Sequence, residues 1–466
     1  MIATLVLFGA SGDLAGRFLL PALAALQASR RLPESFGVVG AAREDWDDRA
    51  FQRHAEERLE EHAAELPFAA RERLIHALRY RQVDLEDVGS VASVVSAAGP
   101  RPVAAYLALP PALFPATITA LNRVGLPAGG RVAVEKPFGE DLNGAIALNA
   151  LLAELSGAAG EQALFRVDHV LGMATVQNLL GLRLANRVFE AVWNGTHIEQ
   201  IDVLWEETLA LEGRAGYYDQ TGALKDVMQN HVLQVLCLLA MEPPASLKER
   251  DLRDAKVALL RSIRPPARGH MASLTRRARY AAGRIGDRPV PSYADEQGVD
   301  PERGTETFAE VVVSIESPRW AGTRFVLRAG KALERRRKEA VVRFRPVTSS
   351  PFGGDKVAGE LRIGVDGPDD VVLRLTGKRT GAAGGLAPLT LSGGPPSSEL
   401  PPYAHVLLDL LSGDSALSVR GDEAEAAWRV VTPVLEAWAE NRVPLEEYRA
   451  GSAGPAALSA SASAPG

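Results

Sequence analysis

Two short stretches of this chain place a histidine near a carboxylate, and both could carry proton transfer. Asp168 and His169 are adjacent in FRVDHVLG, which follows a short apolar run and ends at a glycine. Neighbours on an extended segment point to opposite sides, so one of the pair can face a ligand while the other supports a catalytic partner. The alternative is a capping aspartate beside a partly buried histidine, and adjacency alone does not choose between them.

The second stretch, DVMQNH, carries Asp226 and His231. Imidazole titrates near neutral pH, so His231 is the best candidate for a general base that takes a hydroxyl proton. On an α-helix the two residues are about 140° apart and share no face, so they could meet one ligand only if Asp226 lies in the first turn. A structural histidine on a helix that faces a sheet is an equal alternative.

Cationic side chains near apolar strands are the next candidates. Lys136 precedes the proline in EKPFG, which holds its backbone extended, and it could bridge a cofactor and a substrate. An ordinary loop lysine is the alternative. Lys331 and the charge run 334–338, with Arg336, could present cations to an anionic ligand, although such runs are usually solvated. The sequence around Glu207 does not by itself indicate a role for this residue.

The start of the chain has the pattern of a phosphate-binding turn. A strand over 3–8 is followed by the turn GASGDLAG, beginning at Gly9, and by an apolar helical stretch. Exposed amides and a helix N-terminus favour an anion, although the spacing is not GxGxxG and a plain turn is the alternative. The second strand ends just before Arg43, and a cation there favours the 2′-phosphate of NADP over NAD. A solvated surface arginine is an equal alternative.

Strands and helices alternate up to residue 172, which predicts a doubly wound parallel sheet. In such a sheet the ligand lies beyond the carboxyl ends of the strands, where Gly9, Arg43, Pro110 and Lys136 all fall. We therefore expect a Rossmann-like, NADP-binding domain over residues 1–172.

After residue 172 the pattern changes to strands with short links, typical of a mainly antiparallel sheet with one covered face. We expect a larger α+β substrate and dimerisation domain over residues 173–450. Two late helices, 404–411 and 423–439, are expected to pack on its sheet. Gly/Pro/Ser composition predicts a loop over 381–398, and Ala/Ser/Gly/Pro composition predicts a disordered tail over 451–466.

Composition narrows the class of protein. The chain has 466 residues and a net charge of -6, without a basic stripe, so no nucleic-acid partner is expected. The single cysteine, Cys237, lies in an apolar run; it can form no internal disulfide and suits a reducing compartment as a small buried side chain. No signal sequence or unbroken apolar run of about 18 to 20 residues is evident, which predicts a cytoplasmic protein without a membrane span.

Taken together, the motifs resemble the glucose-6-phosphate dehydrogenase family. GASGDLA, YLALPP, VEKPFG, RVDHVLG, EGRAGYYDQTGALKDVMQNH, LRAGKAL and PPYAHVLLDLLSGD occur in the family's order and span nearly the whole chain. The resemblance implies an NADP-dependent enzyme of the pentose phosphate pathway that oxidises glucose 6-phosphate at C1 to the lactone. It also implies a homodimer or homotetramer formed across the sheet of the second domain, and no metal.

The resemblance also implies roles for individual residues. His231 matches the general base, Asp168 the carboxylate that orients it, and Lys136 a lysine shared between nicotinamide and sugar, in a turn whose proline is often cis. The residues matched to the substrate are His169, Glu207, Asp226 and Lys331, with Arg336 as a further cation, and those matched to the cofactor are Gly9, Ala10, Ser11, Gly12, Asp13, Leu14 and Arg43.

Departures from the family pattern concentrate at the expected phosphate contacts. Val170, Met173 and Ala174 stand where the family usually has tyrosine, lysine and glutamate, and Gly16 and Phe18 replace cations in the first turn. Losing two charge-assisted contacts of roughly 1.5 to 3 kcal/mol each would weaken phosphate binding about a hundredfold or more. Two alternatives therefore stay open: a paralogue that acts on a different or less phosphorylated sugar, and a catalytically silent NADP-binding regulator.

Overall fold

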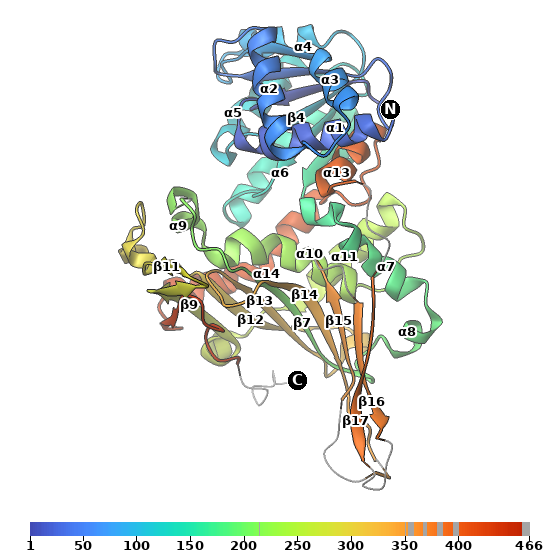
Figure 1. Cartoon of the computed structure of the whole chain (residues 1–466), viewed down its shortest axis with the longest axis vertical. Coiled ribbons are helices and arrows are strands. Elements are labelled where there is room, and N and C mark those ends of the chain that lie inside the picture. The colour runs from blue at the N-terminus through green and yellow to red at the C-terminus, as the bar shows by residue number, and fades with distance from the viewer. Residues whose placement is uncertain are drawn as a thin grey trace. The chain divides into compact units, whose positions relative to one another are not determined.

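The computed structural model describes residues 1–213, 215–349, 351–352, 358–366, 371–379, 385–394 and 400–458. The chain divides into two compact units (Figure 1). Unit 1 comprises Met1–Ala174, Pro244–Asp254 and Ser398–Glu425, and unit 2 comprises Thr175–Pro243, Ala255–Ser397 and Ala426–Gly466. The domain boundaries at residues 172 and 450 stay a prediction.

Unit 1 is built on a parallel sheet of six strands in the order β3-β2-β1-β4-β5-β6. This is the strand order of a Rossmann fold, with its topological switch point between β1 and β4. The strands are β1 (Thr4–Phe8), β2 (Gly37–Ala42), β3 (Leu78–Gln82), β4 (Val103–Leu107), β5 (Arg131–Glu135) and β6 (Leu164–Val167). The expected doubly wound sheet is confirmed.

Helices follow the strands of unit 1, and several begin at aspartates. Asp47, Asp87 and Asp141 each accept hydrogen bonds from backbone N–H groups of the first turn of their helices, which satisfies donors that the helix itself leaves open. The helical segments are η1 (Ala15–Leu19), α1 (Leu20–Ala28), α2 (Asp48–His62), α3 (Phe68–His76), α4 (Val88–Ala97), η2 (Pro111–Leu113), α5 (Phe114–Val124), α6 (Leu142–Ser156), η3 (Gly157–Ala163), η4 (His169–Gly172) and α13 (Pro402–Ser412).

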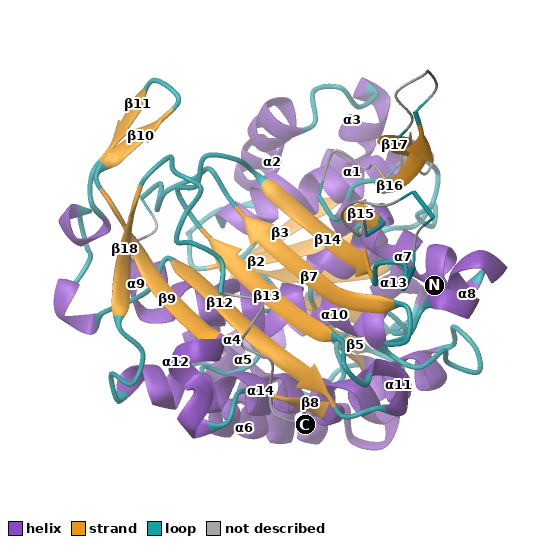
Figure 2. Cartoon of the chain, turned by 90° about the horizontal axis from the view of Figure 1, so that it is seen from below, coloured by secondary structure: helices purple, strands orange, loops and turns teal. Residues whose placement is uncertain are grey.

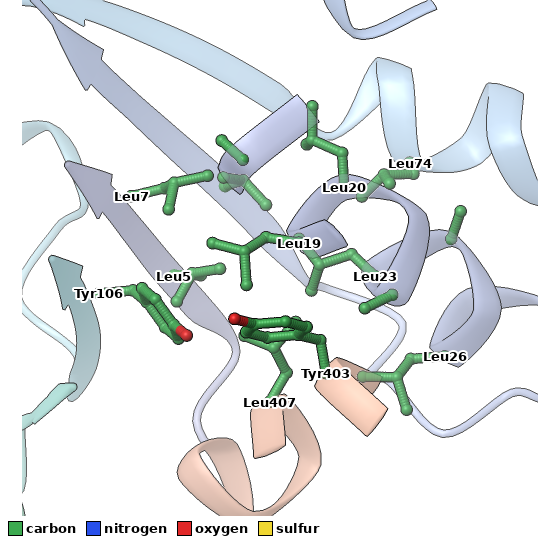
Figure 3. Packing of buried hydrophobic residues seen from close by; sticks show 14 of the residues in the cluster. Leu5, Leu7, Leu19, Leu20, Leu23, Leu26, Leu74, Tyr106, Tyr403 and Leu407 are labelled. Carbon is green, nitrogen blue, oxygen red and sulfur yellow. The ribbon is translucent and has the colours of Figure 1, made fainter. Parts of the chain in front are cut away.

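Helix α13 belongs to the core of unit 1, so the prediction that it packs on the second sheet is wrong. Its Tyr403 and Leu407 lie in one buried cluster with Leu5 of β1 and Leu23 of α1 (Figure 3). Arg131 Nη1 donates to the last carbonyls of α13, those of Leu410 and Leu411, at 2.8 and 2.9 Å. The amphipathic pattern of α13 predicted a buried face but could not show which sheet that face covers.

Within the described residues, one helical stretch, Leu142–Ala163, is long and apolar enough to cross a membrane by length and composition. It consists of α6 followed by the 3₁₀ segment η3, and Gly157 and Gly160 both have positive φ angles there. The 15 residues of α6 span about 22 Å, shorter than the roughly 30 Å of a hydrocarbon core. The stretch is therefore weak support for a membrane span.

Unit 2 is built on a mixed sheet whose main path is β17-β16-β15-β14-β7-β13-β12-β9-β18, with β8 paired to β12. Most neighbours are antiparallel, as expected, but β7 is parallel to β13 and β18 is parallel to β9. The strands are β7 (Ile198–Glu206), β8 (Ile263–Arg264), β9 (Thr275–Ala281), β12 (Phe308–Ile315), β13 (Arg324–Gly330), β14 (Arg337–Phe344), β15 (Glu360–Gly364), β16 (Val371–Lys378), β17 (Leu386–Gly393) and β18 (Leu445–Arg449), beside the hairpin β10 (Gly283–Ile285) and β11 (Arg288–Val290).

The loop expected over 381–398 is corrected by β17, which pairs with β16 from Leu386↔Lys378 to Gly393↔Val371. Pairing with a neighbouring strand overrides the loop-like composition of this stretch. Residues 380–384 and 395–399, which flank β17, lie outside the described residues.

Helices α10 and α14 cover one face of the sheet of unit 2 (Figures 1 and 2). All eight residues of α10 are buried, including Cys237, in agreement with the expectation of a small buried side chain. The helical segments that lie wholly or mostly in unit 2 are α7 (Ala174–Leu184), α8 (Arg187–Val192), α9 (Ala215–Ala223), η5 (Leu224–Val232), α10 (Leu233–Ala240), α11 (Glu249–Ser262), η6 (Arg268–His270), α12 (Met271–Leu274), η7 (Tyr293–Asp295), η8 (Pro301–Arg303), η9 (Pro318–Trp320) and α14 (Gly421–Ala439).

The end of the described chain lies against the sheet of unit 2. Leu458 packs against Val312 and Val326, and its N–H donates to buried Glu310 at 2.8 Å. Residues 451–458 therefore differ from the expected disordered tail, because an apolar side chain and a buried carboxylate hold them. Residues 459–466 lie outside the described residues.

Candidate active site

A cavity of 980 Å³ lies at the carboxyl ends of β1 to β4 in unit 1. It includes the switch point of the sheet between β1 and β4, where doubly wound folds bind their ligands. The lining includes Gly9 and Gly12 after β1, Arg43 after β2 and Pro110 after β4. Three of the four residues expected at this edge thus line one cavity, and the fourth, Lys136, directly follows β5.

The glycine turn after β1 has the geometry of an anion cradle. Gly9 has a φ of +80°, and a Cβ there would lie 2.2 Å from the carbonyl oxygen of Ala108, so no other residue fits. Gly12 and Gly16 continue the turn, with N–H···O bonds of 3.0 Å to Gly9 and Gly12. The backbone can therefore approach a pyrophosphate closely, and the turn fits a dinucleotide.

The other residues expected at the turn occupy different environments. Ser11 lines the cavity, whereas Ala10 is fully buried behind it. Asp13 is exposed and lies 3.5 Å from Arg17, one helical turn later. Leu14 precedes η1 as its N-cap residue.

Lys136 lies between a cis proline and a buried carboxyl group. The peptide bond from Lys136 to Pro137 is cis, as the resemblance implied. Glu135, at the end of β5, is buried, and the hydroxyl groups of Tyr106 and Tyr403 are hydrogen-bonded to it. Burial raises the pKa of Glu135 to about 7, against the lowering effect of both tyrosines and of Lys136.

His169 belongs to a row of aromatic rings in unit 1. Its imidazole stacks on Tyr403, with ring centroids 5.5 Å apart and an interplanar angle of 19°. Tyr403 in turn lies 5.5 Å from the ring of Phe18. Phe18 stands where the family usually has a cation, and its packing on Tyr403 gives this departure a structural reason. Asp168 precedes the row, is buried, and accepts a hydrogen bond from the N–H of Val170 at 3.1 Å.

His231 lies on the π-helix η5 of unit 2, which changes its relation to Asp226. In a π-helix the hydrogen bonds join residues five apart, so Asp226 and His231 are about one turn apart. The separation of about 140° expected for an α-helix is therefore corrected. Asp226 also lies in the first turn of the segment. The side chain of His231 is buried, with only 3% of its surface exposed.

Asn230 accounts for the wide helical turn. Its side-chain amide donates to the carbonyl oxygens of Lys225 and Asp226 at 3.1 and 3.0 Å. Its side-chain oxygen accepts from the N–H of His231 at 2.7 Å. A side chain that enters the backbone hydrogen-bond ladder prevents the tighter α-helical pairing, and here it fixes the N–H group of His231 directly.

The ring of His231 packs on Trp205 of β7, with centroids 5.2 Å apart. The ammonium group of Lys338 lies 4.4 Å from the centroid of the same tryptophan, a cation–π contact. Lys338 also approaches Glu207 at 3.2 Å, and Lys331 approaches the same carboxylate at 2.8 Å. His231 and a pair of lysines thus belong to one connected cluster in unit 2.

Glu207 is the carboxylate that both lysines of this cluster contact. Burial alone would raise the pKa of Glu207, but Lys331 and Lys338 lower it to about 2. Lys338 and Arg336 both contact Asp366, at 3.1 and 2.5 Å. The carboxylates hold three cations in place, so the cluster can present fixed positive charge to an anionic ligand.

Part of this cluster consists of residues that were predicted from the sequence as site residues. Glu207, Lys331 and His231 were expected and do share it, and Arg336 joins it through Asp366. The residues that the sequence did not single out are Trp205, Asn230, Lys338 and Asp366 in unit 2, and Glu44 and Glu135 in unit 1. Asp168 belongs to unit 1 and His231 to unit 2, and their pairing stays a prediction.

Comparisons with known proteins agree with the features of both units. Residues 6–178 match the model of the glucose-6-phosphate dehydrogenase NAD binding domain, and residues 180–466 match that of the C-terminal domain of the same family. The chain belongs to the glucose-6-phosphate dehydrogenase family. The family's NAD binding domain model covers the cavity and the glycine turn, so the cofactor is a nicotinamide dinucleotide.

Relatives within the family are similar over their full length. The glucose-6-phosphate 1-dehydrogenase of Gluconobacter oxydans (strain 621H) is 38% identical, with 97% of this chain and 94% of that protein covered. That of Zymomonas mobilis is 36% identical, with 97% and 96% covered. A solved glucose-6-phosphate dehydrogenase in complex with its substrate glucose-6-phosphate has a TM-score of 0.89 at 31% identity, covering 98% of this chain and 96% of that one. The Mycobacterium avium enzyme has a TM-score of 0.85 at 31% identity, with 97% and 95% covered.

Proposed function

We propose that this chain is an NADP-dependent glucose-6-phosphate 1-dehydrogenase that converts glucose 6-phosphate to the lactone. The observation that carries the proposal is the buried His231 beside a cluster of fixed cations, on a chain that belongs to this family along its whole length. An imidazole suits the removal of the C1 hydroxyl proton, and the cations suit the phosphate at the other end of the sugar.

The proposed roles follow from the position of each group. A nicotinamide dinucleotide held at the glycine turn by Gly9 and Gly12 would supply the acceptor for the C1 hydride. His231 takes the hydroxyl proton on its imidazole, Asn230 fixes its backbone, and Asp168 orients the ring. Lys136 supplies a cation at the end of β5, between the cofactor and the sugar. His169, Glu207, Asp226, Lys331 and Arg336 hold the sugar and its phosphate.

The cofactor-binding residues proposed are Gly9, Ala10, Ser11, Gly12, Asp13, Leu14, Arg43 and Lys136. Arg43 supports NADP, because a cation after the second strand suits a 2′-phosphate. We further propose a homodimer or homotetramer in the cytoplasm, with neither nucleic acid nor membrane as a partner.

The experiment that tests the proposal is an initial-rate panel of phosphorylated and free sugars with wild type and His231→Asn. Wild type should produce NADPH with glucose 6-phosphate and turn over free glucose poorly. His231→Asn should lower kcat about 10²- to 10⁴-fold, the usual contribution of a general base, while the Kd for NADP stays within twofold.

A matched substitution is His270→Asn, because His270 is exposed and also lies in unit 2. This variant should retain the wild-type rate. Turnover of free sugars above that of glucose 6-phosphate would contradict the proposed substrate, and a His231→Asn variant with the wild-type rate would contradict the proposed base.

A further inference from the structure

The cofactor cavity holds a carboxylate beside the arginine expected to read the 2′-phosphate. Glu44 directly follows Arg43, and both line the cavity beyond the end of β2. Their side chains differ in exposure: that of Arg43 is 93% exposed and that of Glu44 is 30% exposed. The acid is therefore the more enclosed of the two groups at this edge.

Glu44 is held in place from several sides. Ser11 of the glycine turn donates its hydroxyl to Glu44 Oε2 at 2.7 Å. The Tyr80 hydroxyl donates to the backbone carbonyl of Glu44 at 2.8 Å, and the N–H of Trp46 donates to the same carbonyl at 3.0 Å. The carboxylate thus has a fixed position that links the phosphate turn to the end of β2.

The charge of Glu44 is set by these contacts. Burial by itself would raise the pKa of Glu44, but hydrogen bonds from Ser11 and from the backbone, together with Arg43, hold it below its usual value. Glu44 is therefore ionised at neutral pH and is an acceptor without a donor.

An acceptor at the end of the second strand favours a free ribose. In dinucleotide-binding folds an acid at this edge accepts a hydrogen bond from the 2′-hydroxyl of NAD, whereas a cation accommodates the 2′-phosphate of NADP. A phosphate monoester carries about 1.5 to 2 negative charges at neutral pH and is mostly deprotonated, so a fixed carboxylate opposes it. This chain carries both kinds of group.

The rest of the lining adds no second cation. Among the described residues that line the cavity, Arg43 has the one cationic side chain, while Glu44, Asp84 and Glu86 are acidic. Asp84 and Glu86 are exposed, so solvent screens them, and Glu44 is the acid with the strongest effect. Glu44 also compensates part of the charge of Arg43, since Arg43 Nε lies 3.5 Å from Glu44 Oε1.

We infer that Glu44 is a cofactor-specificity residue that lets the site bind NAD as well as NADP, by accepting a hydrogen bond from the 2′-hydroxyl and opposing the 2′-phosphate. This inference deepens the proposed function, on which it rests for the catalytic readout. Ser11 acts through Glu44 as a positioning residue, because its hydroxyl orients the carboxylate.

The test is to measure Kd for NAD and for NADP by titration calorimetry, and kcat/KM for both with glucose 6-phosphate, in wild type and Glu44→Gln. Wild type should bind the two cofactors within about tenfold of each other. Glu44→Gln keeps the size and the hydrogen bond with Ser11 but removes the charge. The NADP-to-NAD preference should rise about 10- to 150-fold, the usual contribution of a hydrogen bond to a charged group.

Two further variants make the result specific. Arg43→Ala should change the preference in the opposite direction, by weakening NADP binding and leaving NAD binding within threefold. Glu56→Gln makes the same chemical change on an exposed position of α2 and should leave both Kd values unchanged.

The outcomes separate the inference from the proposed function. A shift in the Kd ratio without sugar oxidation would support the inference and contradict the proposed function. Wild-type NAD binding more than a thousandfold weaker than NADP binding, or a Glu44→Gln ratio within twofold of wild type, would overturn the inference even if glucose 6-phosphate is oxidised.

Discussion

Replacing Glu135 by glutamine should flatten the pH dependence of stability. The carboxyl has a pKa near its ordinary value of 4.5 in the unfolded chain and of about 7 in the fold, where burial raises it. Between these values the folded protein binds a proton that the unfolded chain has released. Its contribution to stability is therefore present at low pH and is lost as the pH rises through about 7.

The magnitude follows from the two pKa values. At pH 5.5 the proton taken up on folding contributes about 2 kcal/mol to the free energy of unfolding, and at pH 8 it contributes close to zero. In Glu135→Gln the amide is neutral at both pH values, and its oxygen can still accept from Tyr106. The groups that face Glu135, namely Tyr106, Tyr403, Lys136 and Asp168, are unchanged in the variant.

The assay is urea unfolding followed by far-UV circular dichroism at pH 5.5 and at pH 8, with wild type and variant in parallel. The loss of unfolding free energy between the two pH values should be about 2 kcal/mol smaller in the variant. Exposed Glu154 on α6 provides a control, and Glu154→Gln should keep the wild-type slope. Parallel pH dependences for Glu135→Gln and wild type, within about 0.5 kcal/mol, would refute the reasoning.

Two predictions concern unit 2. In Asn230→Ala the amide no longer enters the helical ladder, so η5 should tighten and turn His231; we expect kcat to fall about 100-fold, with cofactor Kd unchanged. In Lys331→Met one of the two cations on Glu207 is lost; we expect KM for glucose 6-phosphate to rise at least about tenfold, with a smaller change in kcat.

For each of these two predictions, one result would contradict the proposed role of the residue. Asn230→Ala with a lower unfolding midpoint and the wild-type kcat would show that Asn230 only stabilises the helix. For the lysine, the exposed Lys378 at the end of β16 allows the same change, and Lys378→Met should leave KM unaltered. Equal KM values for both lysine variants would remove Lys331 from the phosphate site.

The parallel sheet and the phosphate turn could be predicted from sequence because their signals are local. Apolar runs mark the buried strands, and Gly9 marks a backbone conformation that other residues resist. The π-helix could not be predicted. The sequence fits both α-helical and π-helical backbone hydrogen bonding, and only the structure shows that the Asn230 side chain bonds to the backbone and widens the turn. The angular separation expected between Asp226 and His231 was wrong for this reason alone.

Other features depend on contacts between distant segments. The charge run 334–338 was recognised, but only the register of β14 shows that Lys338 points toward Trp205 while its neighbour Arg337 pairs with Glu206. Helix α13 was also predicted, but the sheet that it packs on was predicted wrongly. An amphipathic pattern indicates which face of a helix is buried and does not indicate which element covers that face.

The late position of α13 has a consequence for synthesis on the ribosome. The cluster around β1 is finished by Tyr403 and Leu407, which are translated after nearly the whole of unit 2. Until then the nascent amino-terminal half keeps the apolar surface around Leu5 and Leu23 uncovered, and Glu135 lacks one of its two hydroxyl partners. The elongating chain therefore keeps apolar surface of the kind that favours aggregation exposed until α13 has emerged, and unit 1 is completed only close to termination.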